Sequence, residues 1–461
     1  GNWVRQSTDM RGQWGITKDN SGRLYHNNNS TMLVGDQFAP DFFRGNPDYT
    51  PRRMPSHRLS GNAVHPIRIT PGVNRAYRKG TLDSEGKLAN VTAACGVHVY
   101  RGDNFPKEML GMGFVCEPGG DLVKAVKISR DEWNKPSGTH PYGEKEFLAT
   151  TDEWFLPCNI YTAPDGTLWI VDMYFGLLQH RAYLTTYLRK QYASRGLDKP
   201  KPSTGRIYRV RYAKNAANKV PQLEGLKAAE LVKYLAHPNG TVRDTAQRLI
   251  VESGDQSVAE ELSKLAADKN NPLAQIHALW TLEGLNTPHL IPVAFQAACK
   301  STNDDVVRTA LNVAATLRPG SKYLYDTLVH LEKKPSYLHA LVRAMAANGM
   351  ADKAMDITMK NGKVDYLVEA FISGLGPDLK AFQEKHPNLA NLPIKKHLTA
   401  ASKKSKATKI PEGAHLKGDT LAAFKRGKAL YTTKAACFGC HGGDGKGMPN
   451  LGPPLAPSEW A

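Results

Sequence analysis

Two cysteines separated by two residues, with a histidine directly after them, form the pattern in this chain that most clearly suggests chemistry. They are Cys437, Cys440 and His441. This spacing is the attachment pattern of c-type haem, because each thiol can add to one vinyl group of the porphyrin. The imidazole of the next residue can then bind the iron as its proximal ligand. The motif therefore predicts covalently bound haem c, with His441 as the ligand of the metal.

The same cysteine pair could instead be a redox dithiol or half of a zinc site. A zinc site needs a second pair of ligands at a similar spacing, and His441 is the one further ligand nearby. A thioredoxin-like dithiol needs a strand before it and no histidine after it. The residues therefore favour haem over both alternatives.

The flanks of the motif strengthen this prediction. Asp419 and Thr420 could cap a helix that runs towards Tyr431. A glycine-rich run follows the motif at residues 442–447, and a Pro-Pro-Leu sequence comes shortly after it. Residues 427–460 resemble the class of cytochrome c domains whose motif reads CxxCHGxDGxG…PPLxxSxW. The resemblance implies a small all-α haem domain.

The sixth iron ligand is less well defined by the sequence. Met448 follows His441 closely. In monohaem cytochromes of this kind the distal methionine usually comes tens of residues later, because the chain must travel around the haem. We therefore expect Met448 to be a loop residue and the distal ligand to lie beyond Ala461. A chain ending there would leave the iron five-coordinate, or ligated by water or by another chain.

Length and composition indicate the number of domains, and haem attachment indicates the compartment. The chain has 461 residues, of which 41% are hydrophobic, enough for about three domains with packed cores. No apolar run is long enough for a membrane span. Covalent haem attachment takes place outside the cytoplasm, so a periplasm or an equivalent compartment is expected. There a Cys95–Cys116 disulfide could form, although two buried free thiols are the expectation.

The formal net charge of +18 suggests that a basic face meets an acidic redox partner, an acidic glycan or an anionic membrane. Nucleic acid is discounted as a partner, because the chain has no recognition motif for it. Gly1 is neither an initiator methionine nor the start of a signal peptide. We expect a signal peptide before it and the rest of the haem domain after Ala461.

Residues 1–212 consist of short β-type runs separated by turn residues. Residues 15–25 match residues 159–169, since each reads as a strand, a tight turn built on Asp and Gly, and a second strand. Residues 96–116 form a looser copy. Such hairpins at blade-like intervals predict part of an all-β propeller, with a β-sandwich as the main alternative. A stretch of this length makes about four or five blades at roughly 40–45 residues each, so further blades are expected before Gly1.

Seven short motifs in this region follow one another in a familiar order. They resemble the propeller of the haem-binding, cytochrome-fused membrane-bound dehydrogenases of planctomycete and verrucomicrobial type. Those propellers are similar to the glucose/sorbosone dehydrogenase family, some members of which use pyrroloquinoline quinone (PQQ) and calcium. The family continues with helical repeats and a haem domain, so the resemblance covers nearly the whole chain. The motifs are Gln13-Trp14-Gly15, Tyr100-Arg101-Gly102, Phe114-Val115-Cys116-Glu117-Pro118, Thr151-Asp152-Glu153-Trp154-Phe155, Pro164-Asp165-Gly166, Val171-Asp172-Met173-Tyr174 and Gly205-Arg206-Ile207-Tyr208-Arg209.

The resemblance does not assign a catalytic residue. In the quinone-dependent relatives the base is a histidine on the top face of an early blade. The histidines that could serve here are His26, His98, His140 and His180. His26 is followed by three asparagines and could sit at a propeller mouth, with a solvated loop histidine as the alternative.

Three further acidic positions are candidates. Asp172 and His180 follow the last clear strand and could line a central channel, although Asp172 could equally cap a turn. Glu117 and Asp121 flank two glycines and could offer carboxylates to a sugar or to Ca²⁺.

Residues 213–395 change to helical periodicity. Helix-pair units with apolar faces recur about 34 residues apart, as between Pro238 and Pro272, which predicts an α-solenoid of HEAT type. Arg243 and Arg308 occupy the turn before the second helix of their units, where an arginine usually bonds the neighbouring repeat. Residues 396–416 read as a basic linker, and residues 417–461 as the start of the cytochrome c domain.

These observations lead to one main hypothesis, an extracytoplasmic c-type cytochrome oxidoreductase. Its propeller would oxidise a carbohydrate-type alcohol or aldehyde, with PQQ and Ca²⁺ as candidate cofactors, and pass electrons to haem c. The second hypothesis is a non-enzymatic electron-transfer or scaffold subunit of a larger redox complex. A third is a lyase or hydrolase acting on a sugar, with the haem in another role. Propellers host many functions, so the fold alone does not choose among them.

Overall fold

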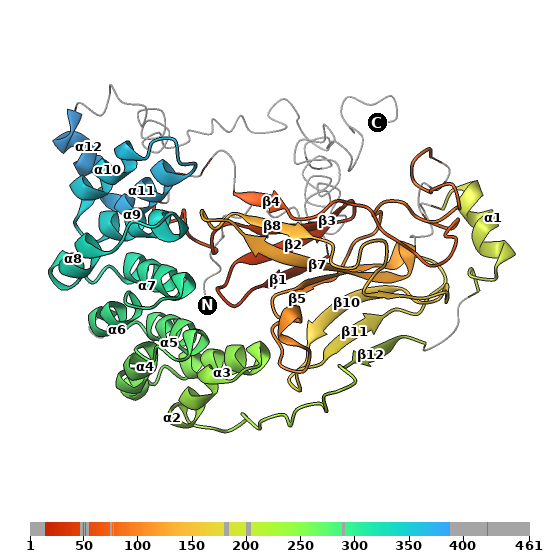
Figure 1. The fold of residues 1–461 in the computed structure, drawn as a ribbon, viewed down its shortest axis with the longest axis horizontal. Coiled ribbons are helices and arrows are strands. Elements are labelled where there is room, and N and C mark those ends of the chain that lie inside the picture. The colour runs from red at the N-terminus through yellow and green to blue at the C-terminus, as the bar shows by residue number, and fades with distance from the viewer. Residues whose placement is uncertain are drawn as a thin grey trace. The chain divides into compact units, whose positions relative to one another are not determined.

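The computed structural model describes residues 14–46, 49, 51, 55–73, 76, 78–178, 184–199, 204–287, 291–387 and 422. The chain divides into two compact units, Gly1–Ser402 and Lys403–Ala461. The described residues of the first unit form a β-sheet region followed by a helical region (Figure 1). The haem motif, the linker and Met448 lie outside the described residues.

The first sheet contains β1 (Ile16–Lys18), β2 (Leu24–Asn28), β3 (Thr31–Asp36) and β4 (Ser56–Arg58), which pair in that order and run antiparallel. The turn between β1 and β2 is built as the sequence predicts. Asp19 Oδ1 accepts the amide N–H of Ser21 and of Arg23, and Gly22 supplies a positive φ of 78°. An Asp at the start and a Gly at the end therefore close this hairpin.

The second sheet contains β5 (Val97–Val99), β6 (Gly113–Glu117), β7 (Leu122–Arg130) and β8 (Pro136–Thr139), with β9 (Leu148–Ala149) also paired to β7. The third contains β10 (Pro157–Thr162), β11 (Leu168–Asp172) and β12 (Arg206–Val210). Its first turn repeats the chemistry of the β1–β2 turn. Asp165 Oδ1 accepts the Thr167 amide, and Gly166 has a φ of 83°. The three predicted copies thus each begin a sheet.

The first strands of the three sheets lie beside one another, since β5 contacts both β1 and β10. Gly96, just before β5, allows this approach, because a Cβ atom there would overlap the backbone of Asn159. The part of the chain that is described forms three successive antiparallel sheets and no closed ring of them. Propellers close with at least about four blades, so three sheets cannot do so by themselves.

The helical region follows a long exposed segment. After α1 (Thr186–Ser194), which lies between β11 and β12, the helices are α2 (Ala228–Leu231), α3 (Gly240–Ser253), α4 (Ala259–Ala266), α5 (Pro272–Gly284), α6 (Ile291–Ala298), α7 (Asp304–Leu317), α8 (Ser321–His330), α9 (Leu338–Ala347), α10 (Ala351–Lys360), α11 (Leu367–Leu375) and α12 (Leu379–Lys385). Helices α3, α5, α7, α9 and α11 contact one another in sequence, and α4, α6 and α8 do the same. This two-layer stack of helix pairs is the HEAT-like arrangement that the periodicity predicts (Figure 1).

Asparagine caps set the start of successive repeats. The side chains of Asn239, Asn271 and Asn303 accept amide N–H groups in the first turns of α3, α5 and α7. These asparagines recur at equal intervals along the chain. Because an N-cap satisfies donors that the helix itself cannot, one polar residue per repeat fixes the register of the stack. None of the helices within the described part combines the length and apolar character that a membrane span requires.

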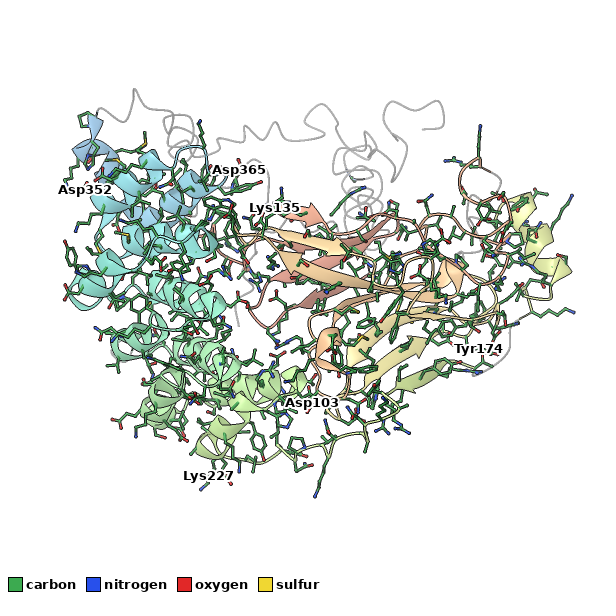
Figure 2. The ribbon with its side chains drawn as sticks, viewed as in Figure 1. Asp103, Lys135, Tyr174, Lys227, Asp352 and Asp365 are labelled. Atoms are coloured by element: carbon green, nitrogen blue, oxygen red, sulfur yellow. The ribbon has the colours of Figure 1, made fainter. Side chains whose placement is uncertain are left out.

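Polar and aromatic side chains join the sheets to the first helical layer. Arg101 forms a two-point ion pair with Asp244 of α3, at 2.6 and 3.0 Å, and Arg23 pairs with Asp305 of α7 at 2.8 Å. A loop after β3 places Phe38, Phe42 and Phe43 in the hydrophobic core of the helices. Figure 2 shows Asp103 and Lys135 on the side of the sheets that faces the helices, and Tyr174 on the side away from them.

The two predicted repeat arginines differ in their contacts. Arg308 donates to the backbone oxygen of Ser336, in the next repeat, as predicted. Arg243 is fully buried and instead donates to the oxygens of His237 and Pro238 in its own turn and to Asn20 of the β1–β2 hairpin. The prediction for Arg243 was therefore wrong about its partner, because its guanidinium is taken up by its own turn and by Asn20 of the β1–β2 hairpin.

Candidate functional site

A cavity of about 690 Å³ lies beside the first strands of the sheets. Its volume falls in the range of small-molecule sites. The wall is mostly apolar, with a few side chains that can form hydrogen bonds. The described lining residues are Trp14, Asn29, Thr92, Ala93, Cys95, Pro118, Cys158, Asn159, Tyr161, Val171, Met173 and Leu178.

Cys95 and Cys116 are both buried free thiols, so the disulfide that the sequence allowed is not formed. Burial raises the pKa of Cys95 and of Cys116. Burial also raises the pKa of Cys158, the second thiol in the cavity wall. All three thiols therefore stay protonated near neutral pH, and none is an activated nucleophile.

Two carboxyl groups, one at the end of β6 and one directly before β7, have pKa values that burial raises. Glu117 is fully buried, and its Oε1 and Oε2 accept the Ala93 amide N–H at 3.2 and 3.1 Å. Burial raises its pKa to about 8, although these amide donors oppose the rise. Burial likewise raises the pKa of Asp121 to about 7, against the pull of Arg68 at 2.5 Å. Both groups thus exchange protons close to neutral pH, which is typical of functional sites.

Asp121 belongs to a network of alternating charges. Arg68 also pairs with Glu153 at 3.1 Å, and Arg195 pairs with the same Glu153 oxygen at 3.1 Å. These four side chains line a second, small cavity that shares Pro118 and Leu178 with the large one. The acidic groups therefore lie next to the large cavity rather than in its described wall.

Two of the candidate histidines, His26 and His98, lie within strands. His26 lies within β2, only 4% exposed, with Nε2 at 3.7 Å from Asp36 Oδ1. His98 lies in β5 and its Nε2 accepts the Thr162 amide N–H of β10 at 2.9 Å. Burial lowers the pKa of His98 to about 4, so it is neutral and links two sheets. None of these residues is among the described residues lining the large cavity.

Asp172 ends β11 and is almost fully buried. Its Oδ1 accepts the amide N–H of Leu156 and of Tyr174, each at 2.8 Å. This is the turn-capping role that the sequence left open beside a channel role. His180, Cys437, Cys440, His441 and Met448 lie outside the described residues.

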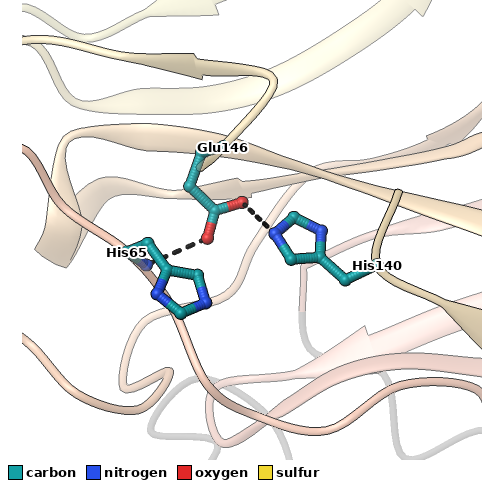
Figure 3. Close-up of side chains that lie close together, drawn as sticks. All are labelled: His65, His140 and Glu146. Carbon is teal, nitrogen blue, oxygen red and sulfur yellow. Dashed lines mark hydrogen bonds and ion pairs between the residues drawn. The ribbon is translucent and has the colours of Figure 1, made fainter. Parts of the chain in front are cut away.

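Several residues of these clusters escaped the sequence analysis. Arg68, which pairs with Asp121, and Glu153, which pairs with Arg68, come from segments far from Asp121 in the chain. His65 and Glu146 meet His140 in a third cluster (Figure 3). No local motif brings these residues together, because strand pairing and sheet packing do so.

Three family models match successive parts of the chain. Residues 2–214 match a domain of unknown function (DUF7133), residues 228–318 match HEAT repeats, and residues 424–461 match cytochrome c. No curated protein matches the chain. The protein is thus a multidomain protein with a β-sheet region, HEAT repeats and a C-terminal cytochrome c domain, which supports an electron-transfer haem protein. The matches do not confirm the dehydrogenase family that the sequence resembles.

Proposed function

We propose that the protein is an extracytoplasmic c-type cytochrome in which Cys437 and Cys440 hold the haem and His441 ligates its iron. The cytochrome c match over residues 424–461 carries this proposal, because it contains the whole motif. The donor set fits the group, since two thiols can form the thioether links and an imidazole can ligate iron. The bound haem would supply a one-electron acceptor.

We further propose that the β-sheet region oxidises a carbohydrate-type alcohol or aldehyde and that electrons then pass to the haem. The cavity of about 690 Å³ supports this, because it can enclose a small organic substrate. Burial raises the pKa of the adjoining Glu117 and Asp121 carboxyls to about 8 and about 7, which would suit groups that take up a proton in a substrate oxidation. In this proposal the three sheets are propeller blades within residues 1–212. The blades are then connected to the haem domain by the solenoid of residues 213–395 and the linker of residues 396–416.

PQQ and Ca²⁺ do not fit the described residues of these cavities. PQQ carries three carboxylates, yet the described lining of the large cavity contains no lysine or arginine. Ca²⁺ takes six to eight oxygen ligands, roughly, from unpaired carboxylates and carbonyls. Here Glu117 faces backbone amides, and Asp121 faces an arginine. We therefore assign neither group to these positions.

A second candidate function is that of a non-enzymatic electron-transfer subunit. The same cavity wall favours it, because its described residues include no histidine, carboxylate or lysine that could act as a base. In this case a partner enzyme would deliver electrons to the haem. The net charge of +18 would suit an acidic redox partner.

The haem assignment is tested by a pyridine haemochrome spectrum of protein made in a host that exports and matures c-type cytochromes. We expect the spectrum of a haem that is attached through two thioether links. The Cys437→Ser and Cys440→Ser variants should each either give the spectrum of a haem attached through one thioether link or lose the haem. Cys299→Ala, at a buried thiol after α6, is the matched control and should keep both links. Wild-type protein without covalent haem would refute the assignment.

The oxidation is tested by recording haem reduction after addition of a panel of sugars, sugar alcohols and aldoses, with and without added PQQ and Ca²⁺. Substrate-dependent reduction by the protein alone would support the proposed dehydrogenase. No reduction by any substrate, but rapid reduction by a co-purifying redox enzyme, would favour the electron-transfer subunit. Product formation without haem reduction would indicate a lyase or hydrolase instead.

A further inference from the structure

Two histidines and a glutamate form a compact cluster outside both cavities. His65 follows β4, His140 follows β8, and Glu146 lies between β8 and β9. One ring nitrogen of each histidine and one carboxylate oxygen of Glu146 lie within 4.8 Å of one another. Figure 3 shows the carboxylate between the two histidines. The cluster therefore brings three potential metal ligands from two sheets to one point.

The tautomer of His140 leaves one nitrogen free to bind. Its Nδ1 lies 3.1 Å from the backbone oxygen of Ala125 and donates its proton there. The Nε2 atom then carries a lone pair, and it lies 3.7 Å from Glu146 Oε2. Histidines that ligate metals in proteins almost always donate their other N–H to a carbonyl or carboxylate in this way.

The carboxylate of Glu146 is held by one oxygen and leaves the other available. The side chain is fully buried. Oε1 accepts the backbone N–H of His65 at 3.0 Å and lies 3.5 Å from Lys124 Nζ. Oε2 and His140 Nε2 are both buried, and within the described structure neither has a hydrogen-bond partner. Buried polar atoms without partners cost free energy. A third group bound between these two facing atoms would satisfy both of them.

A simple ion pair is the competing explanation. A protonated His140 would donate to Glu146 at about 2.7–2.9 Å, as charged pairs do. The observed separation of 3.7 Å is longer than that. It is close to the spacing of about 3.3 Å between two ligands of a tetrahedral ion with bonds of roughly 2.0–2.1 Å. Lys124 approaches Oε1 and not Oε2, so its charge does not occupy the position between the ligands.

The second imidazole is well placed to complete the set. The rings of His65 and His140 are parallel, with centroids 5.7 Å apart and an interplanar angle of 1°. Lys124 is fixed by donating to the Ala63 oxygen at 2.8 Å, two residues before His65.

We propose that His65, His140 and Glu146 bind one Zn²⁺ ion, distinct from the haem iron. Two imidazoles and one carboxylate are a donor set that suits zinc and other borderline divalent metals, and not Ca²⁺ or Mg²⁺. Three protein ligands leave a fourth position for water. The ion would join the loop after β4 to the segment between β8 and β9, and so would tie the first sheet to the second.

The test is zinc analysis of the haem-loaded full-length protein. The protein is stripped with a chelator and dialysed against Zn²⁺, and zinc and iron are then counted separately by elemental mass spectrometry. We expect about one zinc per chain in addition to the haem iron. His140→Ala and Glu146→Gln should each weaken zinc binding by more than about 100-fold, because even the partners of metal-bound histidines are worth about 10–100-fold. His57→Ala, at a half-buried histidine of β4 outside the cluster, is the matched control and should bind zinc as the wild type does.

A zinc X-ray absorption spectrum of the wild type separates the outcomes without any variant. Two imidazoles and only nitrogen or oxygen ligands support the site. Sulfur ligands would place the ion on cysteine thiols outside the cluster and would overturn it. Stoichiometry well below one, or equal binding by wild type and Glu146→Gln, would overturn it as well.

Discussion

At the scale of single residues, Glu117 shows how burial changes the chemistry of a carboxyl group. Its folded-state pKa of about 8 lies above the ordinary 4.5, so the folded state holds an extra proton between these pH values. Stability is therefore expected to fall as the pH rises from about 4.5 to about 8. Glu117→Gln, which has the same shape and does not ionise, should lose this part of the decrease. Denaturant midpoints across this pH range, for wild type and variant, measure the effect.

Glu85→Gln is the control for this measurement, because Glu85 lies on the surface in a turn. It should leave the pH profile as in the wild type. Parallel profiles of wild type and Glu117→Gln would show that the Glu117 carboxyl does not take up a proton on folding.

The sequence anticipated some of these residues and not their partners. Glu117 and Asp121 were recognised as candidates from the glycines between them. The Arg68 that pairs with Asp121, and the amides that surround Glu117, could not be predicted. They approach from other parts of the chain, and a pattern of neighbouring residues contains no information on such contacts.

At the scale of elements, the loop after β3 is fitted closely to the last helices. The amide N–H of Gly45 donates to Ser373 Oγ at 3.1 Å, and Ser373 Oγ donates to the Phe42 oxygen at 2.7 Å. A Cβ at Gly45 would overlap the backbone oxygen of Ser373. Gly45→Ala should therefore cost about 1–3 kcal/mol, as overpacking of a close contact does. Thermal and denaturant unfolding of the helical region measure this.

Gly61→Ala is the matched control, because nothing lies within 4 Å of a Cβ built there. Its midpoint should stay close to that of the wild type. Equal midpoints for the two variants would mean that the loop does not dock on α11 in solution.

Local sequence patterns predict the strands and helices themselves better than they predict how these elements pack against one another. The hairpins with Asp and Gly in their turns and the helix pairs were predicted, since turn chemistry and periodicity act over a few residues. The aromatic loop with Phe38, Phe42 and Phe43 was not, because its apolar residues face a helix layer more than 200 residues away in the chain.

At the scale of the whole first unit, ion pairs join the sheets to the solenoid across the exposed segment between β12 and α2. Arg101 is 7% exposed and Asp244 is 28% exposed, so their pair is partly buried. Arg101 also donates from Nε to Asn20 at 2.7 Å. Exposed pairs contribute about 0–1 kcal/mol and broken buried pairs cost about 3–5 kcal/mol, so Arg101→Ala should cost about 2 kcal/mol.

Limited proteolysis within residues 213–227 gives a direct measurement. The two nicked pieces of the wild type should elute together in gel filtration, and those of Arg101→Ala should separate at lower denaturant. Arg248→Ala removes an exposed pair with Glu252 and should behave as the wild type. If the nicked wild type separates at once, the ion pairs do not hold the two regions together.

The sequence by itself determined the features that depend on neighbouring residues. These are the Cys437–His441 motif, which predicts haem attachment, the hairpin turns and the helical repeats. Only the tertiary structure decided which distant side chains share a site, such as His65 with His140 and Glu146. It also decided that Asp172 caps a turn and that Cys95 and Cys116 remain thiols. The physical reason is that covalent attachment, turns and helix faces are set by local spacing, whereas burial and pairing depend on how the sheets and helices pack.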